Sequence, residues 1–409
     1  MMFLLLIFII PISMSIDNGV GIQPAMGYNT WNDYNCDRIN EENVASVIHA
    51  FVRLNLSSFG YNYINLDDCW ASHRDKTGTI VADKNKFPNG IKYLADLAHK
   101  NGLKFGIYTD RGRLTCAWKP GSYGYEQQDA DTYASWGIDY VKEDSCFSFT
   151  VTHQEAFAEY EKMRDALNST GRHILFSLCG WHNWYAPKGK FIGNSWRIAR
   201  DVGSWDEALN TIDVNSHLSQ YASPGSFNDA DMLLGSKIGS NVVLSPQQSR
   251  TQFSMWAIMS SPLLLGTNVA NMTTDEWDYE TYTNHEIISV NQDKLGKQGC
   301  RISGGNMHGL CGDKINIWAK LLSDGSWGII FINNNDYNVD IVCDKSCMEK
   351  MNLLGSFHVR DLWLHKNVGI FNSSNLFEAK NVEKNGGSKM YKFISLHRSK
   401  FNSLVANTF

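Results

Sequence analysis

Several motifs that would assign a common enzyme class are missing from this chain. There is no Cys-x-x-Cys pair and no Cys/His set at zinc spacing, which argues against a structural zinc site. No His-Glu-x-x-His stretch supports a zinc protease, and no Gly-x-Ser-x-Gly elbow supports a serine hydrolase. No Gly-x-Gly-x-x-Gly follows a strand-like run, which weakens a dinucleotide-binding interpretation. The composition leaves one kind of metal site open, a Mg²⁺ site whose ligands are all aspartates.

The chain also lacks a basic excess and a long apolar segment. The net charge of its 409 residues is −5, which predicts neither nucleic acid nor an anionic membrane as partner. The apolar run 3–10 is too short to span a bilayer well, and Ser13 and Ser15 follow it at the spacing of a cleavage site. Residues 1–15 are therefore predicted to be an export signal, although no Lys or Arg precedes the run. A membrane anchor is the alternative.

Export predicts an oxidising compartment, which suits a chain with nine cysteines and therefore at least one free thiol. Four glycosylation sequons fit the same prediction, at Asn55, Asn168, Asn271 and Asn372. The sequence leaves open whether the protein is secreted or kept in a vacuole or lysosome. It also leaves the oligomeric state open, with a homodimer as one option.

Short apolar runs alternate with helical patterns from about residue 24 to 265. The strand-like runs are 61–66, 103–108, 138–141 and 173–178, and the helical patterns are 91–100, 129–136 and 154–167. This alternation predicts a parallel sheet with helices outside it. About eight such units in about 270 residues suit a (β/α)8 TIM barrel, with an open doubly wound sheet as the alternative.

After about residue 300 helical periodicity is absent and short alternating runs take over. They lie at 315–321, 327–332, 357–359 and 390–396. This texture predicts a small antiparallel β domain. The predicted organisation is a signal at 1–15, a catalytic barrel at 16–299 and an antiparallel β sandwich at 300–409.

Carboxylates gather where the predicted strands end, which is where a β/α barrel carries its active site. The strand ends are 66–70, 108–110, 141–146, 196–201 and 227–232. Cleavage of a glycosidic bond needs one carboxylate to attack or stabilise the sugar centre and a second carboxyl to protonate the leaving oxygen. Any single aspartate here could instead be a helix cap or a loop ion pair. The row as a whole indicates a glycosidase.

Motifs along nearly the whole chain resemble family 27 of the glycoside hydrolases, the α-galactosidases and α-N-acetylgalactosaminidases. They occur in order at 17–19, 24–32, 60–70, 87–91, 103–108, 120–125, 136–142, 228–232, 256–263 and 291–299. The resemblance implies a barrel followed by a β domain, no cofactor, and terminal α-galactosides of oligosaccharides, glycolipids or glycoproteins as substrates. It also implies a retaining reaction, in which the two carboxyls lie about 5–5.5 Å apart.

The resemblance assigns roles to particular residues. Asp144 corresponds to the nucleophile and Asp201 to the acid/base. Asp67 and Asp68 would bind the 4- and 6-hydroxyls, Lys142 would bridge a hydroxyl and the nucleophile, and Arg197 would lie near the 2-position. The remaining predicted substrate-binding residues are Trp31, Tyr108, Gly180, Trp181, Asp231 and Met232.

Family pairing further implies disulfides Cys36–Cys69 and Cys116–Cys146. Proximity in the chain alone suggests Cys300–Cys311 and Cys343–Cys347, which leaves Cys179 free.

Three residues depart from the family pattern. Gly180 stands where α-galactosidases usually carry Glu, so the preference at the sugar 2-position is open, and His182 or Trp184 is expected to fill the gap. Glu143 replaces an aromatic residue, but adjacent strand residues face opposite sides, so it should point away from Asp144. Arg200 precedes Asp201 and is expected to point outward for the same reason.

The main hypothesis is therefore a retaining α-galactosidase. An α-N-acetylgalactosaminidase is the alternative within the enzyme class. A catalytically weak galactose-binding protein is the alternative from another class, but it predicts loss of Asp144 or Asp201, and both are present.

Overall fold

A computed structural model describes residues 18–238, 241–309 and 311–396. The predicted export signal, residues 1–15, lies outside the described residues. Within the described ranges, every helix is too short or too polar to cross a membrane.

Eight parallel strands curl into a barrel in the order β12-β1-β2-β5-β6-β7-β8-β9. A single parallel bridge from Leu233, downstream of β9, to Leu265 of β12 closes the ring. The predicted barrel is confirmed. The strands are β1 (Met26–Asn29), β2 (Tyr63–Leu66), β5 (Lys104–Asp110), β6 (Tyr140–Asp144), β7 (Leu175–Leu178), β8 (Ser195–Arg197), β9 (Phe227–Asp229) and β12 (Leu263–Leu265).

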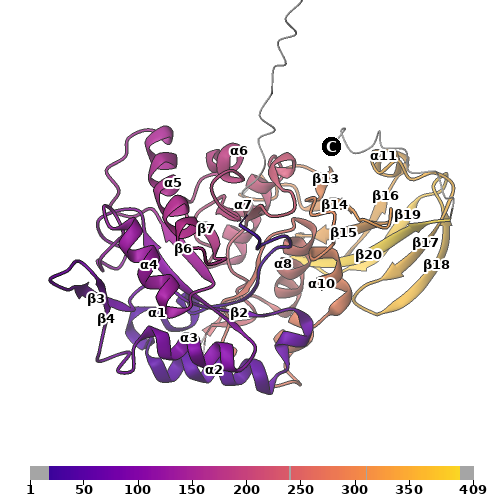
Figure 1. Ribbon diagram of the computed structural model, residues 1–409. Coiled ribbons are helices and arrows are strands. Elements are labelled where there is room, and N and C mark those ends of the chain that lie inside the picture. The colour runs from indigo at the N-terminus through magenta and orange to yellow at the C-terminus, as the bar shows by residue number, and fades with distance from the viewer. Residues whose placement is uncertain (1–17, 239–240, 310, 397–409) are drawn as a thin grey trace, which may run out of the picture.

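Helices surround this barrel on the left side of Figure 1. They are α1 (Trp31–Arg38), α2 (Glu41–Arg53), α3 (Ile91–Lys100), α4 (Glu126–Trp136), α5 (His153–Ser169), α6 (Ala186–Gly189), α7 (Trp205–Asn215), α8 (Pro246–Ile258), α9 (Trp277–Tyr282) and α10 (His285–Asn291). Local sequence sets several of their ends. Thr152 and Glu155 form a capping box at the start of α5, and Gly137, with φ of 80°, ends α4 in a left-handed conformation.

The chain then forms an antiparallel β domain, coloured orange to yellow in Figure 1. One sheet has the order β13-β14-β15-β20-β17-β18 and faces a second sheet, β16-β19. The bounds are β13 (Cys300–Ser303), β14 (Ile315–Leu321), β15 (Trp327–Asn333), β16 (Val339–Cys343), β17 (Ser356–Asp361), β18 (Lys366–Asn372), β19 (Phe377–Val382) and β20 (Gly387–Ser395). The predicted antiparallel β domain is confirmed, and it also contains a short helix, α11 (Lys345–Lys350), between β16 and β17.

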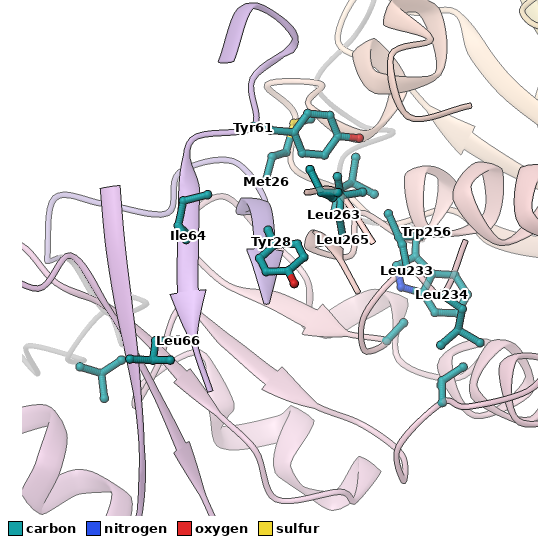
Figure 2. Packing of buried hydrophobic residues seen from close by; sticks show 14 of the residues in the cluster. Met26, Tyr28, Tyr61, Ile64, Leu66, Leu233, Leu234, Trp256, Leu263 and Leu265 are labelled. Carbon is teal, nitrogen blue, oxygen red and sulfur yellow. The ribbon is translucent and has the colours of Figure 1, made fainter. Parts of the chain in front are cut away.

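Two main apolar cores hold the molecule together. The barrel core joins the strands to the surrounding helices, and Figure 2 shows Tyr28, Ile64, Leu265 and Trp256 among its buried members. The second core fills the space between the two sheets of the β domain. Contacts of α8 with β15 and β20 join the two domains.

Candidate active site

The carboxyl ends of neighbouring barrel strands bring the predicted acidic residues together. Tyr108 on β5 pairs in register with Lys142 on β6, and Asp110 pairs with Asp144. Asp67 and Asp68 follow β2 directly, and Arg197 is the last residue of β8. The parallel arrangement places these ends at one edge, as the sequence predicted.

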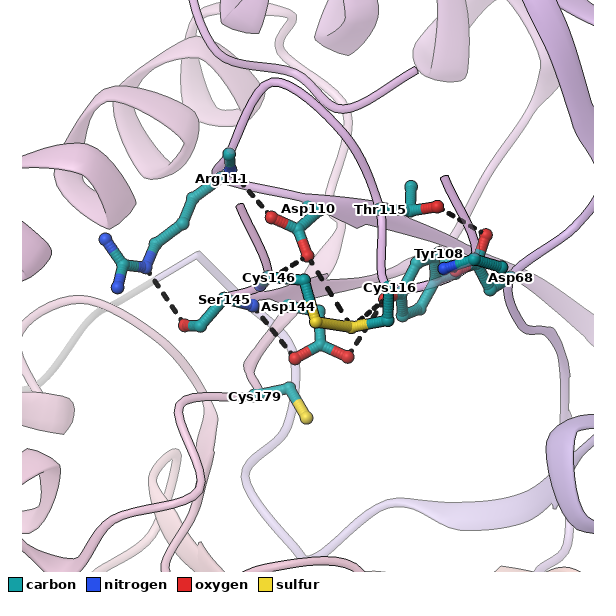
Figure 3. Close-up of a disulfide and its surroundings, with 12 residues drawn as sticks. Asp68, Tyr108, Asp110, Arg111, Thr115, Cys116, Asp144, Ser145, Cys146 and Cys179 are labelled. Carbon is teal, nitrogen blue, oxygen red and sulfur yellow. Dashed lines mark hydrogen bonds between the residues drawn. A yellow bond between two sulfur atoms is a disulfide. The ribbon is translucent and has the colours of Figure 1, made fainter. Parts of the chain in front are cut away.

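Asp144 is buried and held by two hydrogen bonds (Figure 3). The Tyr108 hydroxyl donates to Oδ2 and the Ser145 backbone N–H donates to Oδ1, both over 2.9 Å. Burial raises the pKa of Asp144, while the positive charge of Lys142 and these hydrogen bonds act in the opposite direction. Asp144 is thus a desolvated carboxyl group whose ionised form is favoured by Lys142 and by the two hydrogen bonds.

Lys142 links Asp144 to the acidic pair that follows β2. Its ammonium lies 2.8 Å from Oδ2 of Asp67, which also accepts a 2.7 Å hydrogen bond from the Asn29 amide. Burial opposes the charge of Lys142, yet attraction to Asp67 and other anionic neighbours raises its pKa well above the ordinary value. Lys142 therefore stays protonated.

Asp68 is fixed by donors from the next loop of the barrel. The Thr115 hydroxyl and the Ala117 N–H each donate to its carboxylate over 2.9 Å. Trp31 is half-buried at the start of α1, and its N–H donates to Asn29. These contacts place Trp31, Asp67 and Asp68 along one wall of the barrel mouth.

Arg197 ties together the opposite wall. Its guanidinium lies 2.9 Å from Asp201 and 2.8 Å from Asp231, and it donates to Cys179 Sγ over 3.8 Å. Asp231 is buried, whereas the Asp201 side chain is 69% exposed. Desolvation works to raise the pKa of Asp201, but the charges of Arg197 and Lys142 and the hydrogen bond from Arg197 together outweigh it, and the net shift is downward. Arg197 thus binds one buried and one accessible carboxylate on this wall. Met232 is buried next to Asp231.

The surroundings of Gly180 differ from the prediction. Neither His182 nor Trp184 fills the space beside it; an added Cβ at Gly180 would lie only 1.9 Å from Cε2 of Tyr185. Tyr185 is buried and stacks on Trp184 at a centroid distance of 3.8 Å. The absence of a side chain at position 180 is therefore a packing requirement of Tyr185. Trp181 follows Gly180, half-buried.

Of the two other residues that depart from the family pattern, one lies as expected and one does not. Glu143 faces away from Asp144 as expected, because it lies fully buried and its neighbouring charges come from Asp110, Arg111, Glu126 and Glu159. Arg200 was expected to point outward, but it lines the same hollow as Asp201. Strand alternation does not apply there, since β8 already ends at Arg197.

Three of the four expected disulfides are present: Cys36–Cys69, Cys116–Cys146 and Cys343–Cys347. Figure 3 shows Cys116–Cys146 beside Asp144, and Cys69 of the first disulfide directly follows Asp68 in the chain. The pairing Cys300–Cys311 was wrong, since both thiols are free. Cys300 begins β13 while Cys311 lies in an exposed loop beyond that strand, so nearness in sequence did not bring them together.

Sequence reasoning missed two residues of this site as participants. Cys179 was expected to be a free thiol, but the sequence did not predict that it belongs to the site. Its buried thiol interacts electrostatically with Asp144, Arg197 and Lys142. Asp110 is fully buried and accepts hydrogen bonds from Gly112 and Cys146 N–H, which shape the loop beside the nucleophile candidate. Its position at a strand end was a signal that could have identified it.

Two groups of the described residues have metal-ligand spacing, but neither suits an ion. In the first, Asp110 lies near Cys116 and Cys146, whose sulfurs are joined to each other. In the second, Glu286 lies between His285 and His365, but both of its oxygens are bound by Arg360 over 2.6 Å. Of the predicted glycosylation residues, Asn55, Asn168 and Asn271 are exposed and Asn372 is half-buried.

Comparison with known proteins identifies related chains. Residues 23–293 match the family described as alpha galactosidase A, and residues 312–393 match the alpha galactosidase C-terminal beta sandwich domain. A probable alpha-galactosidase of Dictyostelium discoideum is 39% identical over 88% of this chain and 90% of its own length.

Solved structures give the same result. Alpha-galactosidase I of Mortierella vinacea is 33% identical, with a TM-score of 0.84 over 93% of this chain and 99% of that one. The alpha-galactosidase of Saccharomyces cerevisiae, solved with raffinose, is 28% identical, with a TM-score of 0.82 over 92% and 98% of the two chains.

Proposed function

Since the chain belongs to glycoside hydrolase family 27 and is an α-galactosidase, we propose that it works by retaining double displacement with Asp144 as nucleophile and Asp201 as acid/base. The supporting observation is the contrast between the two carboxylates. Asp144 is buried and held by donors, while Asp201 is exposed at the opposite wall, where a leaving group can reach it.

In the first step Asp144 attacks the anomeric carbon and Asp201 gives its proton to the glycosidic oxygen, which releases the aglycone. In the second step Asp201 takes a proton from water, and the water oxygen displaces Asp144 to yield galactose of unchanged configuration. Burial raises the pKa of Asp144, and Lys142 and Tyr108 counteract this shift by favouring the ionised form that attacks. Arg197 favours the ionised form of Asp201, which the second step requires.

The other site residues bind the galactosyl unit. We propose that Asp67 and Asp68 accept hydrogen bonds from the 4- and 6-hydroxyls, that Trp31, Tyr108, Trp181, Asp231 and Met232 line the pocket, and that Arg197 lies at the 2-position. Because Tyr185 occupies the space beside Gly180, that gap is no pocket for an acetamide group. We therefore propose a preference for the 2-hydroxyl over the 2-acetamido sugar. Paired chromogenic α-galactoside and α-N-acetylgalactosaminide substrates test this preference, and faster cleavage of the latter would refute it.

The mechanism is tested with an activated aryl α-galactoside and added azide. Asp144→Gly should lose hydrolysis, and azide should yield the β-galactosyl azide, because the anion then attacks from the vacated face. In Asp201→Gly, the rate of hydrolysis should fall about 10²–10⁴-fold for substrates with poor leaving groups. Azide should then attack the covalent intermediate and yield the α-galactosyl azide. Asp96→Asn, an exposed carboxylate on α3, is the control. Wild-type activity in Asp144→Gly without azide would rule out the assignment.

The substrates and the compartment are proposed on separate observations. We propose α-galactosyl oligosaccharides of the raffinose type as substrates, supported by the raffinose complex of the yeast relative. We further propose export through residues 1–15, supported by three disulfides, and glycosylation at the exposed Asn55, Asn168 and Asn271 and at Asn372. Mass spectrometry of the secreted chain, with and without glycosidase treatment, tests both.

A further inference from the structure

A hollow beside Asp201 lies between the loops that follow β7 and β8. It has a volume of about 430 Å³ and is lined by Trp181, His182, Arg200, Asp201 and Glu207. If Asp201 protonates the glycosidic oxygen, the group bound to that oxygen must lie against the same wall. The hollow is therefore where the leaving group departs.

Aromatic stacking anchors the first wall of this hollow. Trp184 stacks on Tyr185 and on His153 of α5, at centroid distances of 3.8 Å and 3.7 Å. The ring of His182 lies nearly parallel to Trp184 at 6.1 Å. Trp181 has a φ of 58°, in the left-handed region that a bulky side chain rarely adopts. The loop is thus held in an uncommon conformation that brings an indole and an imidazole to the hollow.

The second wall carries a cation and a carboxylate. Oε2 of Glu207, in the first turn of α7, accepts hydrogen bonds of 2.9 Å from Gly203 N–H and the Ser204 hydroxyl. Its Oε1 carries no such bond to the described residues. Within the same part of the chain, the exposed guanidinium of Arg200 and the imidazole of His182 also have no hydrogen-bond or ion-pair partner. Donors and an acceptor therefore remain unused around one hollow.

We propose that this hollow is a subsite for a sugar leaving group, and that Arg200, His182 and Glu207 bind the hydroxyls of that sugar. The inference rests on the proposed function, because it takes Asp201 as the acid. Each hydroxyl of a hexose both donates and accepts, so it can satisfy the guanidinium, the imidazole and the free carboxylate oxygen. The face of Trp181 suits the apolar face of a sugar ring. A simple alkyl leaving group uses none of these contacts.

The test compares two substrates that differ only in the leaving group. Methyl α-galactoside and the disaccharide α-galactosyl-(1→6)-glucose both release an alkoxide that needs the acid, but only the second presents sugar hydroxyls. For Arg200→Ala, kcat/KM for the disaccharide relative to the methyl glycoside should fall about tenfold, and for His182→Ala about threefold, as expected for lost hydrogen bonds. Arg200→Lys should recover part of the ratio, since it keeps the charge but not the planar fork.

Two readouts separate this role from a structural one. With methyl α-galactoside, the pH profile of each variant should match that of the wild type. Lys366→Ala removes an exposed cation on β18 and should leave kcat/KM unchanged for both substrates. An unchanged ratio overturns the inference. An equal fall for both substrates overturns it too, because the residues would then position Asp201. Failure of the wild type to cleave even methyl α-galactoside would instead refute the proposed function.

Discussion

Glu143→Gln should make the stability of this protein less dependent on pH. Glu143 lies on β6 with 0% exposure, and neither carboxylate oxygen has a hydrogen-bond partner among the described residues. Burial raises its pKa well above the ordinary value; Asp110 and the nearby Glu126 and Glu159 add to this, while Arg111 opposes it. The folded protein therefore holds Glu143 protonated, whereas the unfolded chain releases this proton above pH of about 4.3.

The sign and size of the effect follow from linkage. Because the folded-state pKa is the higher one, the stabilisation is present at low pH and is lost as pH rises through the window between the two pKa values. The loss is about 1.4 kcal/mol per pH unit while the folded state keeps the proton, or about 2–3 kcal/mol between pH 4.5 and 6.5. With an unfolding entropy of about 0.8 kcal/mol/K for a chain of this size, that corresponds to about 2–4 °C in melting temperature.

The assay is thermal unfolding of wild type and Glu143→Gln at half-unit steps of pH. The melting temperature of the variant relative to wild type should increase steadily with pH, because glutamine has no proton to release. Glu161→Gln, at a glutamate on α5 whose side chain is 46% exposed, is the control and should show no such trend. A constant difference across the range would mean that Glu143 ionises normally, which would refute the reasoning from its burial.

Three further predictions concern the site and the domain junction. Tyr108→Phe removes a hydrogen bond to Asp144 and should move the acidic limb of kcat/KM to higher pH by about 0.5–1 unit. Gly180→Ala should destabilise the fold by about 1–3 kcal/mol in chemical denaturation, because its Cβ meets Tyr185. Burial lowers the pKa of Lys320 to about 7, so wild-type stability should rise with pH between about 7 and 10, and thermal melts of Lys320→Met should lack this slope.

Each of these three predictions has its own refutation. An unmoved acidic limb in Tyr108→Phe would mean that the hydroxyl does not support ionised Asp144. Wild-type stability of Gly180→Ala would mean that Tyr185 can move aside at no cost. Equal pH slopes for wild type and Lys320→Met would mean that Lys320 stays charged when folded.

The architecture, and the edge of the barrel at which the acidic residues gather, could be predicted from sequence patterns alone. The pattern at 91–100 predicted a helix, and α3 has those bounds. The runs at 315–321 and 327–332 predicted strands, seen as β14 and β15. Such patterns are readable because each strand or helix repeats its burial along a few neighbouring residues. Parallel strands end at one edge, so an acid at each predicted strand end already indicated that these carboxylates lie together.

Which of these groups interact depends on how distant segments pack. Lys142 meets Asp67 from another strand, and Arg197 joins Asp201 to Asp231, across separations that no local pattern records.

The same limit explains the expectations that were wrong. Cys300 and Cys311 are near in sequence but are carried apart by a strand and its loop, and the space beside Gly180 is filled by Tyr185. Burial that depends on packing between distant segments also sets the protonation of Glu143. A chain's own periodicity fixes its elements, but contacts between elements depend on how the whole barrel closes.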